Sequence, residues 1–413
     1  MLSADAMDQR IRQYRTAEVT LTVTDADGKP MADAEVTVRM VRQKFLFGCN
    51  IFRLNPGSAA DRDRAYGEKF QELLNFATLP FYWRSYERSE GNTRAEQIRK
   101  MAQWCRERGI RTKGHPLVWT LEPAWLAEKT PAEGEALLWK RIAREVEQFR
   151  GLIDTWDVLN EAVVGPDQAE ARDAQTALRL YQRDGRGAVI ERAFAVARKA
   201  GPRATLILND FRSDDAYAAL ITDALAASVP IDAIGIQSHM HGEYWGAERT
   251  WDVCERFARF GKPLHFTEVT ILSGEAVGQI DWENRRRTRW ATSREHEERQ
   301  AERAAEFYRV LFSHPAVEAV TWWDLSDEGA WMGAPAGLLH EDMTPKPAYL
   351  ALRKLIREEW WTGPLTLGTD RSGKVRFRGF LGEYVVQSGD RTASLQLTSP
   401  GESDLSIRLA NSP

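Results

Sequence analysis

The chain has few of the residues that build cross-linked or metal-bound scaffolds. Its 413 residues include only three cysteines, Cys49, Cys105 and Cys254, which are widely spaced and form no Cys-x-x-Cys pair. We therefore expect neither a disulfide framework nor a zinc site. The chain also lacks an apolar stretch long enough to cross a membrane, and its first residues lack the apolar region of a signal peptide. A soluble protein is expected, secreted or periplasmic if a signal peptide has been removed, and the native compartment is left open.

The chain also lacks a large excess of charge of either sign. The formal net charge is -4 with 28% charged residues, and the only short run of like charge is Arg285, Arg286 and Arg287. Such a balance does not favour a nucleic-acid partner. A glycine-rich phosphate-binding fingerprint is missing as well. We expect no cofactor, no metal, no nucleic-acid or membrane partner, and a monomer.

Aromatic residues, in contrast, are abundant. The chain has 15 Trp, 10 Tyr and 16 Phe. About half of the tryptophans would serve as core filler. The others are expected to line a surface that stacks flat, partly apolar ligands such as sugars.

The middle of the chain alternates short apolar runs with segments of helical periodicity. A helix of this kind, residues 187–201, ends at Gly201 and Pro202. Eight strand-helix units favour a (β/α)8 barrel, a TIM barrel in the α/β class, over an open doubly wound sheet. The eight apolar runs are residues 44–50, 75–81, 113–119, 154–161, 205–210, 232–239, 263–268 and 317–324.

Both ends of the chain have a different pattern, in which apolar and polar residues alternate around turns such as "DADGKP". We predict β segments at residues 1–44 and 363–413, flanking a catalytic barrel at 45–362. A barrel's chain enters and leaves at the face opposite the active site, so both segments are expected to form one small all-β accessory module there. A structural brace is favoured over a carbohydrate-binding module.

Polar residues at the ends of the predicted strands are expected to meet at one mouth, because barrel active sites lie at the carboxyl ends of the strands. Glu161 ends the fourth run and Glu268 the seventh. Two carboxylates across a mouth are the minimal equipment for hydrolysing a glycosidic bond. Glu161 has apolar neighbours, which favour a protonated acid. His239 is placed to orient Glu268, and Asn160 is a natural donor to a sugar hydroxyl.

At this point the sequence resembles glycoside hydrolase family 10, the retaining endo-β-1,4-xylanases and their relatives. The segments that carry the resemblance are "GHPLVW" (114–119), "WDVLNEAV" (156–163), "IGIQSH" (234–239), "FTEVTI" (266–271) and "TWWDLSDEGAW" (321–331). The resemblance implies that Glu161 is the acid/base and Glu268 the nucleophile. It implies that the residues binding the substrate are Trp83, His115, Trp119, Asn160, Gln237, His239, Trp323 and Trp331.

Some positions depart from the family pattern. After its second strand the family usually has a Glu-Asn pair and then a Lys before Trp, whereas this chain has Thr78, Leu79 and Tyr82. Thr270 replaces the Asp usually found two residues after the nucleophile. Thr120 and Glu122 replace a His and a Gln. The departures leave catalysis intact but change the donors for the non-reducing-side sugars.

Three features have more than one interpretation. The long loop at 272–297 is a solvated loop, a lid, or a site where Arg285 to Arg287 meet uronates. Tyr244 and Trp245 either stack a sugar or pack. The motif "SHMHG" (238–242) has the His-x-His pair of metal-dependent amidohydrolases, but it lies on the sixth run rather than the first.

The sequence therefore predicts a retaining glycoside hydrolase acting on a β-1,4-linked plant polysaccharide of xylan type. An alternative is the same mechanism on another β-glycoside, such as a β-glucan, a decorated oligosaccharide or an aryl glycoside. A second alternative is a carbohydrate-binding pseudoenzyme. Endo or exo action is left open.

Overall fold

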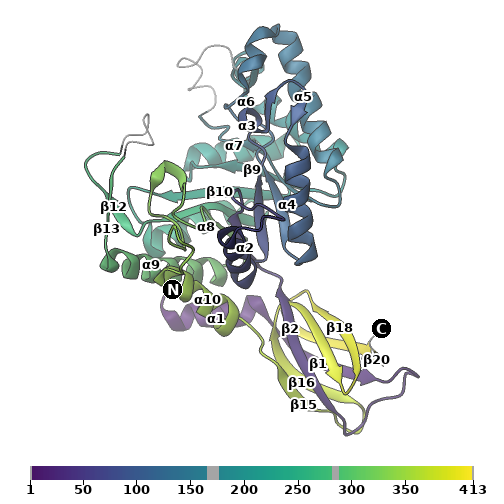
Figure 1. Ribbon diagram of the computed structural model, residues 1–413. Coiled ribbons are helices and arrows are strands. Elements are labelled where there is room, and N and C mark those ends of the chain that lie inside the picture. Colours follow the sequence, from purple (N-terminus) through teal and green to yellow (C-terminus); the bar gives the residue numbers. More distant parts are fainter. Residues whose placement is uncertain (1, 165–175, 281–287, 412–413) are drawn as a thin grey trace.

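The computed structural model describes residues 2–164, 176–280 and 288–411. Eight parallel strands form a closed barrel, as predicted (Figure 1). Each strand overlaps one of the predicted apolar runs, because parallel strands that are covered on both faces are rich in apolar side chains. The overlap is smallest for β7, which begins two residues before its predicted run and ends at His115. The strands are β3 (Leu46–Asn50), β4 (Phe76–Pro80), β7 (Arg111–His115), β8 (Thr155–Asn160), β9 (Thr205–Asp210), β10 (Ala233–Met240), β11 (Leu264–Ile271) and β14 (Val317–Trp322).

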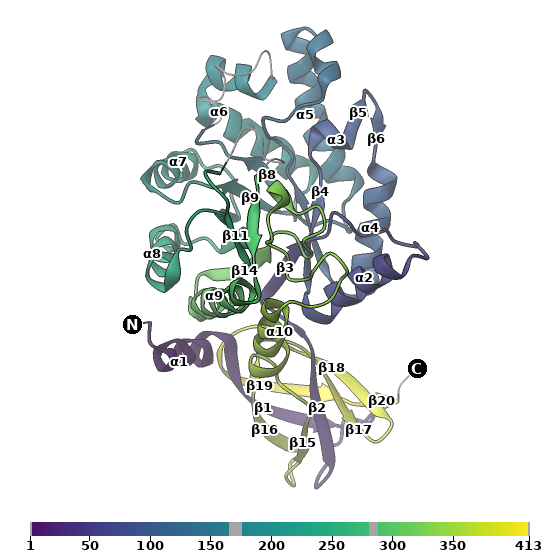
Figure 2. The ribbon, with the colours of Figure 1, turned by 60° about the vertical axis from the view of Figure 1, so that its left-hand side comes forward.

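Helices follow the barrel strands and surround the barrel (Figure 2). Local sequence sets where they begin: Thr130 and Glu133 form a capping box at the start of α5, with Pro131 in its first turn. None of the described helices is long and apolar enough to cross a lipid bilayer. The surrounding helices are α2 (Asp61–Leu73), α4 (Ala95–Glu107), α5 (Pro131–Gln148), α6 (Thr176–Ala200), α7 (Asp215–Ala226), α8 (Gly246–Ala258), α9 (Arg294–Ser313) and α10 (Pro347–Lys354).

Short elements decorate the loops of the barrel. The loop after β11 contains the hairpin of β12 (Gly274–Ala276) and β13 (Trp290–Thr292). The loop after β4 contains helix α3 (Trp83–Tyr86) and the hairpin of β5 (Glu87–Ser89) and β6 (Asn92–Thr93). The part of the chain that the structure describes also contains two 3₁₀ turns, Ala124–Glu128 and Trp331–Gly333, and a π-helical turn, Leu355–Glu359.

Strands from both ends of the chain form two sheets beside the barrel, seen as purple and yellow arrows in Figure 1. Strand β1 lies between β16 and β19, and β2 lies between β15 and β17. An accessory all-β module built from both ends is therefore confirmed; the domain boundaries at residues 44 and 362 stay predictions. The strands are β1 (Thr16–Thr24), β2 (Glu35–Gln43), β15 (Leu365–Gly368), β16 (Lys374–Phe380), β17 (Gly382–Ser388), β18 (Arg391–Leu397), β19 (Gly401–Arg408) and β20 (Ala410–Asn411).

The first residues differ from the predicted β segment, because Ala4–Arg15 form helix α1. Ser3 caps its first turn, and Met7 and Ile11, one turn apart, are its buried residues. Helix α1 packs against α9 of the barrel. The N-terminal segment thus contacts the barrel before it enters the sheets.

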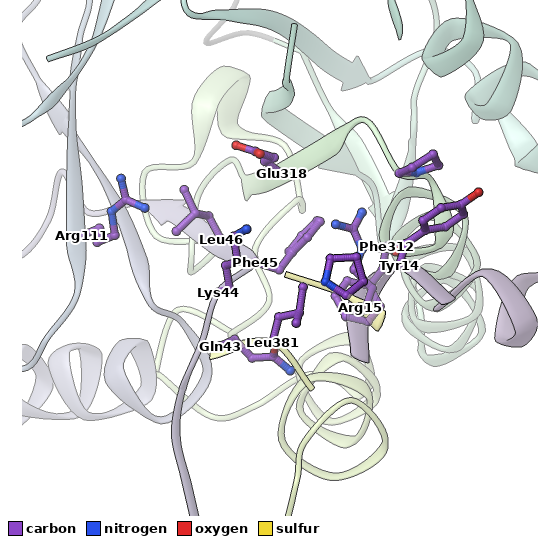
Figure 3. Close-up of a pocket in the computed structure, with 12 residues that line it drawn as sticks. Tyr14, Arg15, Gln43, Lys44, Phe45, Leu46, Arg111, Phe312, Glu318 and Leu381 are labelled. Atoms are coloured by element: carbon purple, nitrogen blue, oxygen red, sulfur yellow. Dashed lines mark hydrogen bonds between the residues drawn. The ribbon is translucent and has the colours of Figure 1, made fainter. Parts of the chain in front are cut away.

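Arg15 joins the accessory module to the barrel. Figure 3 shows its guanidinium beside Phe45 and Phe312, at the edge of a cavity of about 240 Å³. The guanidinium donates hydrogen bonds to the carbonyls of Phe312 at 2.7 Å, His314 at 2.6 Å and Val317 at 2.8 Å. Val317 begins β14, so the contact lies at the amino ends of the barrel strands, opposite the face where barrel active sites are built.

Candidate active site

A cavity of about 530 Å³ lies where the barrel strands end. It brings together all the residues predicted for the site except Trp83. Its lining residues are Tyr82, His115, Trp119, Asn160, Glu161, Phe211, Ser213, Gln237, His239, Trp245, Arg249, Glu268, Trp323 and Trp331.

The expectation that Trp83 binds substrate is not supported by its position. Trp83 is only 5% exposed, its indole donates to Glu87 at 3.0 Å, and Arg141 stacks on its ring. Its neighbour Tyr82 lines the cavity instead. Trp83 is the first residue of helix α3, and Tyr82 is its N-cap with non-helical backbone angles, so strand alternation does not set the directions of the two side chains.

Glu161 follows strand β8 and is held by donors on two sides. The indole of Trp119 donates to its Oε2 at 3.0 Å, and Asn160 and Gln237 donate to its Oε1 at 3.1 and 3.2 Å. Burial nevertheless raises the pKa of Glu161, and the negative charge of Glu268 adds to the rise. Glu161 is therefore the carboxyl group of the pair that more readily keeps its proton.

Glu268 on β11 has the opposite electrostatic surroundings. His239 lies 3.1 Å from its Oε2, the Asn209 amide donates to its Oε1 at 2.9 Å, and His115 Nε2 lies 3.9 Å away. Burial alone would raise the pKa of Glu268, but His115 and His239 outweigh it and leave the pKa below its usual range. Glu268 is therefore held as a carboxylate.

Asn209 connects the two carboxyl groups. The Asn209 amide donates to the side-chain oxygen of Asn160 at 2.7 Å as well as to Glu268. The side-chain oxygen of Asn209 in turn accepts a hydrogen bond from the Thr267 hydroxyl at 2.6 Å. The carbonyl of Asn209 also accepts from the backbone of Glu161, which has a left-handed φ of 60°. Asn209 lies at the end of the fifth predicted run, 205–210, and is therefore among the polar residues expected at the mouth; the structure adds that it contacts Glu268 directly and Glu161 through the backbone and Asn160.

His239 and Trp331 form one wall of the cavity. His239 Nδ1 lies 2.8 Å from the Thr270 hydroxyl, so a neutral group occupies the position where the family resemblance leads one to expect a carboxylate. The rings of His239 and Trp331 are 4.6 Å apart. Asp324 accepts a hydrogen bond from the backbone of Trp331 at 2.7 Å and so holds this wall in place.

The loops after β9 and β10 also contribute to the lining of the cavity. Phe211 and Ser213 come from the first loop, and Trp245 and Arg249 from the second. Phe211 is 43% exposed, which is unusual for a large apolar side chain. Of the predicted aromatic pair, Trp245 lines the cavity, whereas the Tyr244 hydroxyl donates to Glu306 at 2.7 Å. Arg285 to Arg287 lie outside the described residues.

The departures on β4 leave no polar side chain within reach of a ligand there. Thr78 and Leu79 have no exposed surface. Glu122, the other departure, accepts hydrogen bonds from the backbone of Thr176 and Ala177 at 2.6 and 2.9 Å and so caps α6. Thr78, Leu79 and Glu122 therefore make no direct contact in the cavity, whereas Tyr82, which also departs from the family pattern, lines it.

Comparison with known proteins shows which family the chain belongs to. Residues 41–355 match the sequence profile of Glycosyl hydrolase family 10. The chain belongs to this family. Membership confirms the resemblance seen in the sequence and the barrel fold.

The relatives in family 10 include named xylanases. Endo-1,4-beta-xylanase B of Thermotoga neapolitana is 28% identical over 64% of this chain and 75% of its own length. The crystal structure of xylanase 10B from Thermotoga petrophila in complex with xylobiose has a TM-score of 0.63 and 25% identity, covering 76% of this chain and 95% of that one. Anti-sigma-I factor RsgI6 of Acetivibrio thermocellus is 24% identical over 92% of this chain, which spans only 46% of that relative.

Proposed function

We propose that this chain is a retaining glycoside hydrolase that cleaves a β-1,4-linked plant polysaccharide of xylan type. The observation that carries the proposal is the pair of carboxyl groups in one aromatic cavity, with the pKa of Glu161 raised and that of Glu268 lowered. Groups whose environments push their pKa values apart are suited to acid and nucleophile roles. Membership of family 10 supports the retaining course, and the named xylanases support the substrate class.

In the proposed mechanism each step is carried out by one group. Glu268 attacks the anomeric carbon while Glu161 gives its proton to the glycosidic oxygen, so the bond to the leaving sugar breaks and a glycosyl-enzyme ester forms. Glu161, now ionised, takes a proton from water, and that water displaces Glu268 from the anomeric carbon. Asn160 donates to Glu161 and lies within the same network, so it is placed to hold the sugar hydroxyl beside the reacting carbon.

Aryl β-xylosides with different leaving groups test the two roles separately. Glu161→Ala should still form the glycosyl-enzyme from an aryl xyloside with an acidic phenol, because such a leaving group needs no proton. Azide should then accelerate release and give a β-glycosyl azide. Glu268→Ala should lose turnover on every substrate, by about a thousandfold or more, while retaining glycan binding. Unchanged turnover in either variant would exclude the corresponding role.

The competing candidate is a carbohydrate-binding domain without turnover. The likeness to RsgI6, a relative whose name is that of an anti-sigma factor rather than an enzyme, favours it. The complete Glu161 and Glu268 pair, with donors to both, argues against it. Glycan binding by the native chain without release of any sugar, from a panel of xylans, β-glucans, mannans and aryl glycosides, would decide for the binding domain.

A further inference from the structure

Tyr82 lines the cavity and is surrounded by other aromatic rings. The ring of Tyr82 lies 5.3 Å from His115, 5.6 Å from Trp119 and 5.9 Å from Phe52. Phe52, which does not line the cavity, packs against Trp323 at 5.4 Å. Tyr82 is thus the cavity-facing member of a wall that has Phe52 behind it.

The wall stands on the side of Glu268 that holds the sugar to be transferred. His115 contacts both the ring of Tyr82 and, at 3.9 Å, the carboxylate of Glu268. Strands β4 and β10 lie opposite each other in the barrel order, so the loop with Trp245 and Arg249 forms the far end. Phe211 and Ser213 follow β9, the strand beside that of Glu161. The acid faces the leaving group, and the leaving group therefore extends toward β9 and β10.

The hydroxyl of Tyr82 is available to a ligand. Among the described residues the hydroxyl has no protein hydrogen-bond partner. It is also not one of the fully buried polar atoms, so a ligand in the cavity can reach it. Thr78 and Leu79, in contrast, are fully buried and offer nothing to a second sugar. The Tyr82 hydroxyl is thus a polar contact that the aromatic wall offers to a ligand.

We propose that Tyr82 ends the glycone side of the cavity after a single sugar, so that the enzyme releases one sugar at a time from the non-reducing end. The Tyr82 hydroxyl hydrogen-bonds that terminal sugar. This inference rests on the proposed function and deepens it from a bond type to a mode of cleavage. The chemistry is unchanged: each cycle consumes one water and transfers one glycosyl unit through Glu268.

The test uses β-1,4-xylohexaose carrying a fluorescent label at its reducing end. Stepwise release predicts that the label moves first to a five-sugar product, with free xylose as the only unlabelled product. Early labelled fragments of two to four sugars, with unlabelled xylobiose or longer, would overturn the proposal while upholding the glycosidase function. Absence of hydrolysis here and on aryl xylosides would overturn the xylan-type function and this proposal with it.

Two variants assign the effect to Tyr82. Tyr82→Phe keeps the wall and removes only the hydroxyl, so kcat/KM should fall about tenfold with the same single-sugar product. Tyr82→Ala opens the wall and should add unlabelled xylobiose to the products. Tyr244→Phe, whose hydroxyl bonds Glu306 away from the cavity, is the matched control and should change neither quantity. Products from Tyr82→Ala that remain purely monomeric would exclude Tyr82 as the limiting residue.

Discussion

The ammonium of Lys113 lies 2.6 Å from the carboxylate of Asp157, and neither side chain has any exposed surface. Asp157 also holds His115 Nδ1 at 2.7 Å, so one carboxylate neutralises a buried cation and orients a ring of the active site. Burial alone would raise the pKa of Asp157, but Lys113 and His115 outweigh it and lower the pKa. Lys113 also helps to lower the pKa of Glu268.

Asp157→Asn should destabilise the fold, because it leaves the Lys113 ammonium buried without a counter-charge. The expected loss is about 3–5 kcal/mol in the free energy of unfolding, the range for breaking a buried ion pair from one side. Urea unfolding followed by tryptophan fluorescence measures it. Asp154→Asn, at an exposed carboxylate just before the same strand, is the control. Equal midpoints for the two variants would show that the pair does not stabilise the barrel.

His115→Gln should move the acidic limb of the pH profile to higher pH. Glu268 must be ionised to attack, so activity falls as the pH drops through its pKa. His115 is the largest of the influences that lower this pKa, and its removal therefore raises it. The measurement is kcat/KM against pH on an aryl xyloside. An acidic limb at its wild-type position would contradict the assignment of that limb to Glu268.

Trp119→Phe should move the basic limb, also to higher pH. Glu161 must be protonated for the first step, so activity falls as the pH rises through its pKa. The hydrogen bond from the Trp119 indole stabilises the carboxylate form and opposes the rise caused by burial. Without this donor the pKa of Glu161 rises further. A basic limb that moves to lower pH, in the same assay, would reverse the argument.

The barrel could be predicted from the sequence because most of its strands lie in short, largely apolar runs that are separated by segments of helical periodicity. Strand β8, "TWDVLN", is buried at every position and still ends in a polar residue. Such a run followed by a helical segment is recognised as a strand-helix unit from the local sequence alone. The sequence pattern of helix α1 is weaker, since its buried residues are Met7 and Ile11. The alternating apolar and polar residues of the strand that follows it led to the prediction of a β segment instead. The partner of helix α1, α9, lies about 300 residues away, beyond the reach of local pattern.

The sequence predicted which strand ends form the active site, but it did not predict in which direction the side chains of the loops point. A residue at the end of a strand faces the mouth, which is why Glu161 and Glu268 could be paired. Tyr82 and Trp83 follow β4 in a loop and a short helix, so their side-chain directions depend on local backbone rather than strand alternation. The role of Asp157 was missed for another reason. A carboxylate within an apolar run does not reveal that its partner, Lys113, lies on the neighbouring strand.

Arg15→Ala should weaken the attachment of the accessory module without changing the active site. Burial lowers the pKa of Arg15 to about 10, so its guanidinium stays charged at neutral pH, and its three hydrogen bonds to barrel carbonyls are charge-assisted. Losing them leaves these carbonyls without that donor and should cost about 3 kcal/mol in the free energy of unfolding.

Arg12→Ala is the matched control, because the Arg12 side chain is 68% exposed and pairs with the half-exposed Glu18 at 3.9 Å. An exposed pair of this kind contributes little, so the control should unfold like the wild type. Thermal unfolding and kcat/KM are measured on both variants. A lower Tm for Arg15→Ala with unchanged kcat/KM supports a structural brace, since Arg15 lies at the opposite end of the barrel strands from Glu161 and Glu268. Weaker retention of Arg15→Ala on insoluble xylan at unchanged Tm would indicate instead that the module takes part in carbohydrate binding.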